Sequence, residues 1–442
     1  NTLVGGLAGD AITIGGENVA MGYGALGANV SGDRSTAIGY LALSNQNNGT
    51  TTFDANNTAV GFHAGLAITT GTRNVAIGSD ALTSADTDGR NVAIGYAALN
   101  LMNTGNSTPY NVAIGYNAGA SITTALQNTI VGGLAGDALN TGAENVVMGY
   151  GALTDSQEST GNVSIGHESM GNMTDGDNNV AVGKLSLYGG SSANSSNNVA
   201  IGAQALRLTT TGSNNVAIGL QAAKANTTGH SNVAIGYESL NAEDTGRYNV
   251  AVGFETLKNQ NSDADNYNTA VGYRAGLSIT TSVRNTLVGG IAGDALTEGG
   301  DNVALGQDAL SYDQKGSRSV AIGRSALSSQ RFTSATSAHN TAVGFVAGSS
   351  LSTGINNVLI GALCGDAITD ADYNVGVGAG SLGTNTVGSR STAIGTNALF
   401  TQNPSGATDM YNTAVGYEAG LSITTGTDND LFGGAAGDAL TT

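Results

Sequence analysis

The chain has 442 residues, 68 of them Gly and two of them Pro, with no Trp, one Cys and 11% charged residues. This composition excludes helical bundles, and because the Gly residues follow no three-residue period it also excludes collagen. An excess of 33 acidic over 15 basic residues disfavours nucleic acid as a partner, and without an apolar run of roughly 18 residues we expect no membrane insertion.

One short unit is repeated along the whole chain. Residues 111–119, NVAIGYNAG, are one of its twenty-five copies, and eighteen of the twenty-four spacings between copies are 17 residues. Counted from the first residue of a copy, position 5 is always Gly, position 1 is Asn or Ser, and position 4 is always apolar. A single period of this kind predicts one repeat domain over residues 1–442 in place of two or three globular domains.

The pattern within a copy predicts β-structure. Alternate apolar residues over positions 1 to 5 are typical of a short strand with one buried side, and we expect side chains beside the Gly, such as Ile77 and Ile94, to line the interior. Seventeen residues are too few for a helix plus strands. They suit one coil: the strand, a turn at Gly, a second short strand at about positions 7 to 13, and a return turn. The predicted fold is therefore all-β, a parallel β-solenoid of 25 coils, with stacked Asn amides at position 1.

Six copies are longer than the others, at 19 to 22 residues, and every expansion falls just before the next copy. Both Pro residues lie in these segments, and Pro is excluded from interior strands because it has no N–H to donate. We therefore expect six loops at one corner of the solenoid, where a shaft would carry decoration. They are residues 45–56, 100–110, 188–197, 258–267, 328–339 and 400–411.

Two patterns of side-chain volume predict packed contacts. Ten copies have Gly at position 9 and an apolar residue at position 12, such as Ile68 or Ile122, whereas most others have Leu at position 9 and a polar residue at position 12. One space in the interior is thus filled by a side chain from either position 9 or position 12. Position 3 is usually Ala with Tyr or Phe at position 6, but where position 3 is large, as at Ile130, position 6 is small, as at Gly133. We interpret this second balance as an outer surface packed against another chain.

The repeat motif resembles a known family. The strings NVAIGY, NTAVGYEAG (residues 412–420) and STAIGTNAL (residues 391–399) are similar to the head repeats of YadA-like trimeric autotransporter adhesins, and to NTAxGYxAG arrays in phage tail fibres and bacterial surface proteins. The resemblance covers essentially the whole chain. It implies a left-handed parallel β-roll, three chains around one axis, and an adhesive or spacer role. The coil here is longer than the adhesin head coil, and the neck, stalk and anchor of those adhesins are not in this sequence.

No arrangement of residues predicts catalysis or a cofactor. The motif GAGSLG at residues 378–383 matches a nucleotide-binding fingerprint, but Gly378 is only the position 5 Gly and no βαβ unit surrounds it. Cys364 takes a place usually held by Ala and is expected to be a small buried side chain. The four histidines are widely separated and have no recurrent Ser, Cys or carboxylate partner: His63, His167, His230 and His339. We therefore predict a non-enzymatic protein.

Carboxylates two residues apart recur in the return turns. In extended backbone such pairs face one side, and they have the oxygen ligands that Ca²⁺ prefers. Their positions in the coil differ from copy to copy, so we predict no metal site, with Ca²⁺ as the alternative: the pairs are Asp86 with Asp88, Asp175 with Asp177, Asp263 with Asp265, and Asp370 with Asp372. Aspartates in a constant GDA motif are expected to cap turns: Asp10, Asp137, Asp294, Asp366 and Asp438.

Aromatic residues at position 6 form the candidate site. Rings in a row suit either packing between chains or stacking on sugars, and the balance with position 3 favours packing. The predicted strip consists of Tyr23, Tyr40, Phe62, Tyr96, Tyr116, Tyr150, Tyr237, Phe254, Tyr273, Phe345 and Tyr417.

These features together predict an extracellular structural rod. It would be the shaft or head of a cell-surface adhesin or a viral tail fibre, a segment of a longer protein, assembled as a homotrimer. One alternative is a module whose aromatic strip and loops bind host glycans or proteins. The other is a self-assembling filament whose subunits join end to end, because a solenoid exposes strand edges at both ends.

Overall fold

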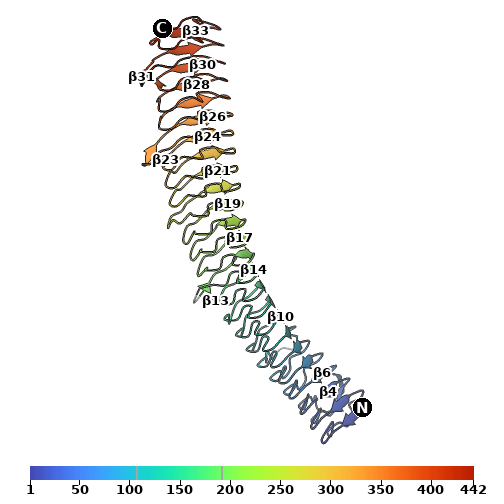
Figure 1. Cartoon of the computed structure of the whole chain (residues 1–442). Helices are drawn as coiled ribbons and strands as arrows, with labels where there is room; N and C mark the ends of the chain where they lie inside the picture. The colour runs from blue at the N-terminus through green and yellow to red at the C-terminus, as the bar shows by residue number, and fades with distance from the viewer. Residues whose placement is uncertain (106–107, 191–192) are drawn as a thin grey trace. The chain divides into compact units, whose positions relative to one another are not determined.

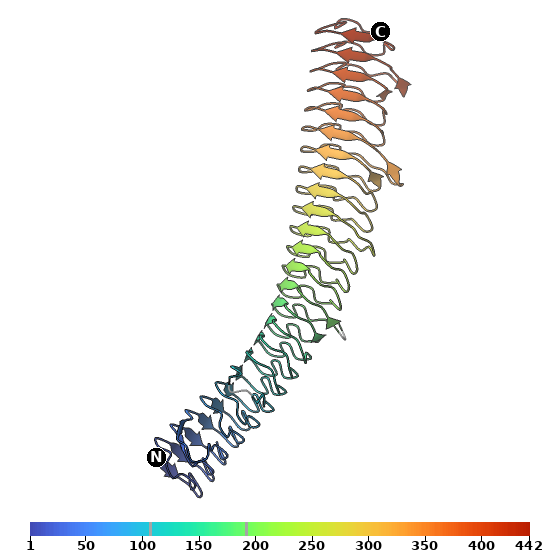
Figure 2. The ribbon, with the colours of Figure 1, turned by 180° about the vertical axis from the view of Figure 1, so that it is seen from behind.

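The computed structural model describes residues 1–105, 108–190 and 193–442, and these ranges contain strands and turns but no helix. Each copy of the repeat forms one coil with a three-residue strand at positions 2 to 4, which confirms the parallel β-solenoid with its 17-residue period. The coils belong to two units, Asn1–Leu220 and Gln221–Thr442, and stack one on the next within each unit (Figures 1 and 2). That the whole chain is one domain, and that the coil is left-handed, stay predictions.

In the first unit every coil strand pairs in parallel with the strands of its neighbours, at a constant register such as Val75↔Val92 and Ile77↔Ile94. Its coil strands are β1 (Thr2–Val4), β2 (Val19–Met21), β4 (Thr36–Ile38), β6 (Thr58–Val60), β7 (Val75–Ile77), β8 (Val92–Ile94), β9 (Val112–Ile114), β10 (Thr129–Val131), β11 (Val146–Met148), β12 (Val163–Ile165), β14 (Val180–Val182), β16 (Val199–Ile201) and β17 (Val216–Ile218).

The second unit repeats this pattern, with pairs such as Val303↔Val320 and Leu305↔Ile322. Its coil strands are β18 (Val233–Ile235), β19 (Val250–Val252), β20 (Thr269–Val271), β21 (Thr286–Val288), β22 (Val303–Leu305), β24 (Val320–Ile322), β26 (Thr341–Val343), β27 (Val358–Ile360), β28 (Val375–Val377), β30 (Thr392–Ile394), β32 (Thr413–Val415) and β33 (Asp430–Phe432).

The Gly at position 5 is required by both its backbone and its surroundings. Gly115 has a φ of +145°, and a Cβ built on it would lie 2.3 Å from the carbonyl oxygen of Gly132 in the next coil. An L side chain rarely adopts such a φ and could not fit against that carbonyl. The predicted turn without a Cβ clash is therefore confirmed.

The predicted second strand at positions 7 to 13 is wrong. Positions 6 to 11 form consecutive turns, in which the Ala118 N–H donates to the Gly115 carbonyl (3.4 Å) and the Ile122 N–H to the Gly119 carbonyl (3.1 Å). Residues at positions 7 and 9 have left-handed backbone, as Asn117 (φ +54°) and Leu99 (φ +49°) show. A strand needs extended backbone, so the apolar residues here fill the interior from a turn.

The predicted interior side of the strand is also wrong. Ala113 at position 3 is 0% exposed, whereas Ile114 at position 4 is 37% exposed. The interior already holds buried Ala118 at position 8, together with Leu or Ile from position 9 or 12, so most coils leave room for only a methyl group from the strand. The large β-branched side chains therefore point outward, which the alternation of apolar residues does not reveal.

In the interior, positions 3, 9 and 12 of neighbouring coils share one volume. A Cβ built on Gly119 would lie 3.0 Å from Ile122 Cδ1, 3.1 Å from Ile130 Cδ1 and 3.2 Å from Leu99 Cδ2. This confirms the interior space that is filled from position 9 or 12. It corrects the interpretation of position 3, because Ile130 is fully buried within its own chain and so compensates for Gly at position 9. The balance with position 6 is no evidence of contact with another chain.

The predicted amide ladder at position 1 is confirmed. The Asn91 backbone N–H donates to Asn74 Oδ1 (3.0 Å), and the Asn91 Nδ2 donates to the same oxygen (3.2 Å). Asn74 Nδ2 in turn donates to the carbonyl of Asp88, which closes the coil from strand to return turn (2.8 Å). These amides are buried, and their hydrogen bonds offset the cost of removing them from water.

The expanded segments leave the coil at its return turn, and several pair with the coil before them through two- or three-residue strands. Residues 106–107 and 191–192, within two of the six predicted loops, lie outside the described residues. The short strand pairs are β3 (Gly32–Asp33) with β5 (Phe53–Asp54), β13 (Met173–Asp175) with β15 (Ala193–Asn194), β23 (Gly316–Ser317) with β25 (Thr336–Ser337), and β29 (Gly388–Ser389) with β31 (Thr408–Asp409).

Candidate binding surface

The predicted strip, here the aromatic row, lies on the outer surface directly after the position 5 turn. All eleven rings are exposed, from 39% at Tyr237 to 60% at Tyr417. The position 4 side chains on the other side of the Gly are partly exposed as well, Met148 by 41%. Each unit therefore presents large apolar side chains on both sides of the turn.

The rings of neighbouring coils stack on one another. In the first unit Tyr40 lies between Tyr23 and Phe62, with ring centroids 5.6 and 5.3 Å apart and planes within 12° of parallel. In the second unit Phe254 lies between Tyr237 and Tyr273 at 5.0 and 5.5 Å. The coil spacing brings these rings together, so within each run the faces of the rings cover each other and the edges face outward.

The remaining members of the row occur in shorter groups. Tyr96 stacks on Tyr116 with centroids 5.4 Å apart, and Tyr150 stacks on His167 at 5.6 Å. Phe345 lies under the Arg324 guanidinium, whose Cζ is 5.7 Å from the ring centroid. Tyr417 interacts with Glu418, which raises the pKa of its hydroxyl.

The residues directly before each position 1, at position 17 in the regular coils and here called the position 17 row, form a second row of large side chains that the sequence reasoning missed. Arg390 lies over the rings of both Tyr373 (4.9 Å) and Tyr411 (5.9 Å), and Tyr248 stacks on Tyr267 with centroids 5.0 Å apart. Members of this row have left-handed backbone. The recurrence of Arg, Tyr and acidic residues just before the position 1 Asn was the available signal.

The polar support of the expanded loops was missed as well. In the second unit Gln330 Oε1 accepts from Asn340 Nδ2 (2.9 Å), while its Nε2 donates to Ser319 Oγ (3.1 Å) and to Asp313 Oδ2 (2.6 Å). Gln330 thus provides the amide oxygen that Ser319 lacks. The signal is in the sequence, since every copy with Ser at position 1 has Gln at position 12: Ser35 with Gln46, Ser319 with Gln330, and Ser391 with Gln402.

The histidines lie apart, each beside its own coil neighbours. His63 Nδ1 is 3.5 Å from Asp80, His167 Nδ1 is 3.8 Å from Glu168, and His230 Nδ1 is 3.3 Å from Ser231 Oγ. Cys364 is buried, its Sγ is 3.0 Å from Ser381 Oγ, and burial raises the pKa of its thiol to about 11. Such a thiol is a poor nucleophile at neutral pH.

The paired carboxylates make hydrogen bonds between coils. Asp177 accepts from the Thr160 N–H (2.8 Å), Asp372 from the Ile355 N–H (2.7 Å), and Asp263 from Thr245 Oγ1 (2.6 Å). Within the described residues, no group of three or more His, Cys, Asp or Glu side chains is arranged to hold a metal ion. That the chain has no metal site stays a prediction.

Three of the GDA aspartates are partly buried. Burial raises the pKa of Asp137, Asp294 and Asp366, that of Asp294 to about 6. Their carboxylates interact with the N–H groups of their own and the following residue, as expected for a turn cap. Asp10 and Asp438 are exposed.

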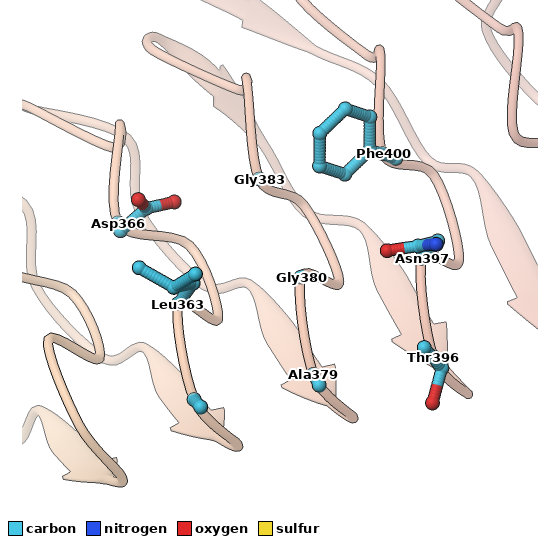
Figure 3. A pocket seen from close by; sticks show the side chains of 9 residues that line it. Leu363, Asp366, Ala379, Gly380, Gly383, Thr396, Asn397 and Phe400 are labelled. Atoms are coloured by element: carbon cyan, nitrogen blue, oxygen red, sulfur yellow. The ribbon is translucent and has the colours of Figure 1, made fainter.

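Asp366 also lines a pocket of about 340 Å³ in the second unit, shown in Figure 3. The coil that begins at Asn374 forms its centre with Gly380 and Gly383, so no side chain rises there. Asp366 lies on one side and Phe400 on the other. The Phe400 ring lies beside the glycines, since a Cβ built on Gly383 would be 2.7 Å from Phe400 Cε2.

Comparison with known proteins adds no family to this description. No protein-family model matches the sequence, and no curated protein matches it significantly. The described residues contain no helix with the length and hydropathy to cross a membrane.

Proposed function

We propose that the chain is a non-enzymatic structural rod of an extracellular fibre, a surface adhesin head or a viral tail-fibre shaft, that mediates or spaces attachment. The observation that carries this proposal is the unbroken strand ladder in each unit, with its buried amide ladder and constant register. Coils that contact only their neighbours extend a protein along one direction, as a spacer requires. The resemblance of the repeat to adhesin heads and fibre arrays supports the same role.

The partner proposed for the aromatic row is a second and a third copy of the same chain. Runs such as Tyr237, Phe254 and Tyr273 are 39 to 52% exposed, and contiguous apolar surface of this kind marks interaction sites. A parallel copy presents rings at the same spacing, one per coil within each run, so the runs of the two copies match. Stacked rings offer edges to a partner, which suits interlocking side chains better than the flat stacking of sugars.

The native mass of the particle tests this assembly. A homotrimer predicts three times the chain mass of 43.7 kDa, independent of concentration. Replacing Tyr237, Phe254 and Tyr273 together by Ala should shift the mass toward the monomer, whereas the double replacement of Tyr248 and Tyr267 in the position 17 row should leave it unchanged.

Two other results would contradict the trimer. A monomeric wild-type chain would remove the assembly from the proposal. A mass that grows with concentration would favour the end-to-end filament. Electron micrographs of the same sample would show the difference between a particle of fixed length and a growing one.

A further inference from the structure

The pocket beside Phe400, here the Phe400 pocket, is made by three successive coils. The middle coil has no side chain at positions 7 and 10, because both are Gly (Gly380 and Gly383). The coil before it contributes Asp366, and the coil after it contributes Asn397 and Phe400. The Phe400 ring and the Asn397 amide extend over the two glycines, because a Cβ on Gly383 would lie 2.7 Å from Phe400 Cε2 and one on Gly380 would lie 2.7 Å from Asn397 Oδ1. The pocket of about 340 Å³ is the space that these side chains leave open.

Figure 3 shows how the three functional side chains lie around this space. The Phe400 ring is seen broadside, Asn397 lies next to it, and Asp366 is across the two glycines. The pocket therefore combines an apolar platform, an amide that both donates and accepts hydrogen bonds, and a carboxylate that accepts them.

The first unit contains a counterpart without this chemistry. The coil that begins at Asn18 also has Gly at positions 7 and 10, Gly24 and Gly27, and follows a coil with Asp10. The next coil has Leu41 where the pocket has Asn397, and Leu41 Cδ2 lies 2.6 Å from a Cβ built on Gly24. By the same measure a Cβ built on Gly380 would lie 2.7 Å from Asn397 Oδ1, so both glycines make room for a side chain of the next coil. The two sites differ in chemistry, with an apolar side chain at this place in the first unit and an amide in the Phe400 pocket.

We propose that the Phe400 pocket binds one pyranose ring of a neutral glycan. The C–H face of the sugar would lie on the Phe400 ring, its hydroxyl groups would donate to the Asp366 carboxylate, and Asn397 would orient it. Aromatic platforms with a few convergent polar groups are typical of such sites. An acidic sugar is excluded, because its carboxylate would meet Asp366 in a chain of net charge −18.

The biological use of this sugar site rests on the proposed attachment role, but glycan binding is tested independently of that role with the full chain. Neutral and sialylated glycans on an array identify a ligand, and titration calorimetry with that glycan measures its affinity. Gly380→Leu should fill the pocket and weaken binding at least about tenfold. This variant should fold, because Leu41 and Leu363 occupy the same position of their coils with positive φ.

Phe400→Ala should weaken binding as strongly as Gly380→Leu, while Phe345→Ala in the aromatic row of the same unit should leave the affinity unchanged. The absence of any neutral ligand, or equal affinity in Gly380→Leu, would overturn the proposal. Loss of binding in Phe345→Ala alone would place the sugar on the aromatic row instead. The native mass of every variant is measured as well. A chain that is monomeric but binds the glycan would contradict the proposed trimer and leave the proposed sugar site unaffected.

Discussion

The position 5 glycine gives the sharpest prediction about the fold, because an adjacent glycine provides a matched control. Gly289 has a φ of +142°, and a Cβ built on it would lie 2.4 Å from the carbonyl oxygen of Gly306. A Cβ on Gly290 would meet no atom of the described residues within 4 Å, and Ala occurs naturally at this position in Ala362 and Ala379.

The expected cost of Gly289→Ala has two parts. Holding a non-Gly residue at this φ costs about 1 to 3 kcal/mol, and forcing the next coil's carbonyl to move costs about 1 to 3 kcal/mol more. The substitution should therefore lower the free energy of unfolding by about 2 to 6 kcal/mol. Gly290→Ala should change it by at most about 0.5 kcal/mol.

Urea unfolding of the two variants measures this difference, and hydrogen exchange locates it. Because coils interact with their nearest neighbours, faster exchange in Gly289→Ala should be concentrated around strands β21 and β22. Equal unfolding midpoints for the two variants would refute the close stacking of these glycines. Faster exchange spread evenly over the unit would refute the local character of the contact.

Three further predictions concern the interior and the loops. Leu359→Ala should cost about 2.7 to 5 kcal/mol, and Gly365→Leu should destabilise by crowding both Leu359 and Ile368. Because Leu359→Ala removes part of that crowding, the double variant should lose less stability than the sum of the two single variants, and additive losses in urea unfolding would contradict the shared volume. Burial raises the pKa of Asp294 from 3.8 to about 6, so its protonated form stabilises the fold fully below pH 3.8 and this contribution is lost as the pH rises through 6. Asp294→Asn should therefore flatten the dependence of the unfolding free energy on pH over this range, and an unchanged slope would contradict the burial of this carboxyl group. Gln330→Ala removes the donor to Oδ2 of buried Asp313, whose Oδ1 still accepts from two backbone N–H groups, and should cost about 1.5 to 3 kcal/mol. It should also speed tryptic cleavage after Arg331, whereas an unchanged cleavage rate would show that Gln330 does not hold the loop.

The repeat alone was enough to predict the coil, its strand and its direction of stacking. The spacing of the glycines and the buried Asn, as at Asn74 and Asn91, carried that information because each feature recurs at a fixed place in every coil. The inner side of the strand could not be predicted in the same way. Alternation shows that Ala113 and Ile114 point to opposite sides, but the side that faces inward depends on how much space other parts of the coil have already filled.

The second strand was mispredicted because apolar residues in a turn resemble those in a strand. Leu99 and Leu153 are buried and recur at one position, yet both have left-handed backbone, which no composition rule for leucine suggests. The Phe400 pocket was beyond sequence reasoning for a related reason. Its residues come from three coils, so they are not adjacent in the sequence. Gly380 and Gly383 are recognisable in the sequence only as part of an accidental match to a nucleotide-binding motif.

The central claim is that each 17-residue segment forms one coil stacked in register on the next. Oxidative cross-linking of the double variant Leu305→Cys with Ile322→Cys tests it most directly, because these residues are register partners on adjacent strands. The fold predicts a rapid intramolecular disulfide between them, and little cross-linking when Leu305→Cys is combined with Ala321→Cys, whose side chain is buried on the other side of the strand. Equal cross-linking of both pairs, or disulfides only between separate chains, would contradict the stacked coils.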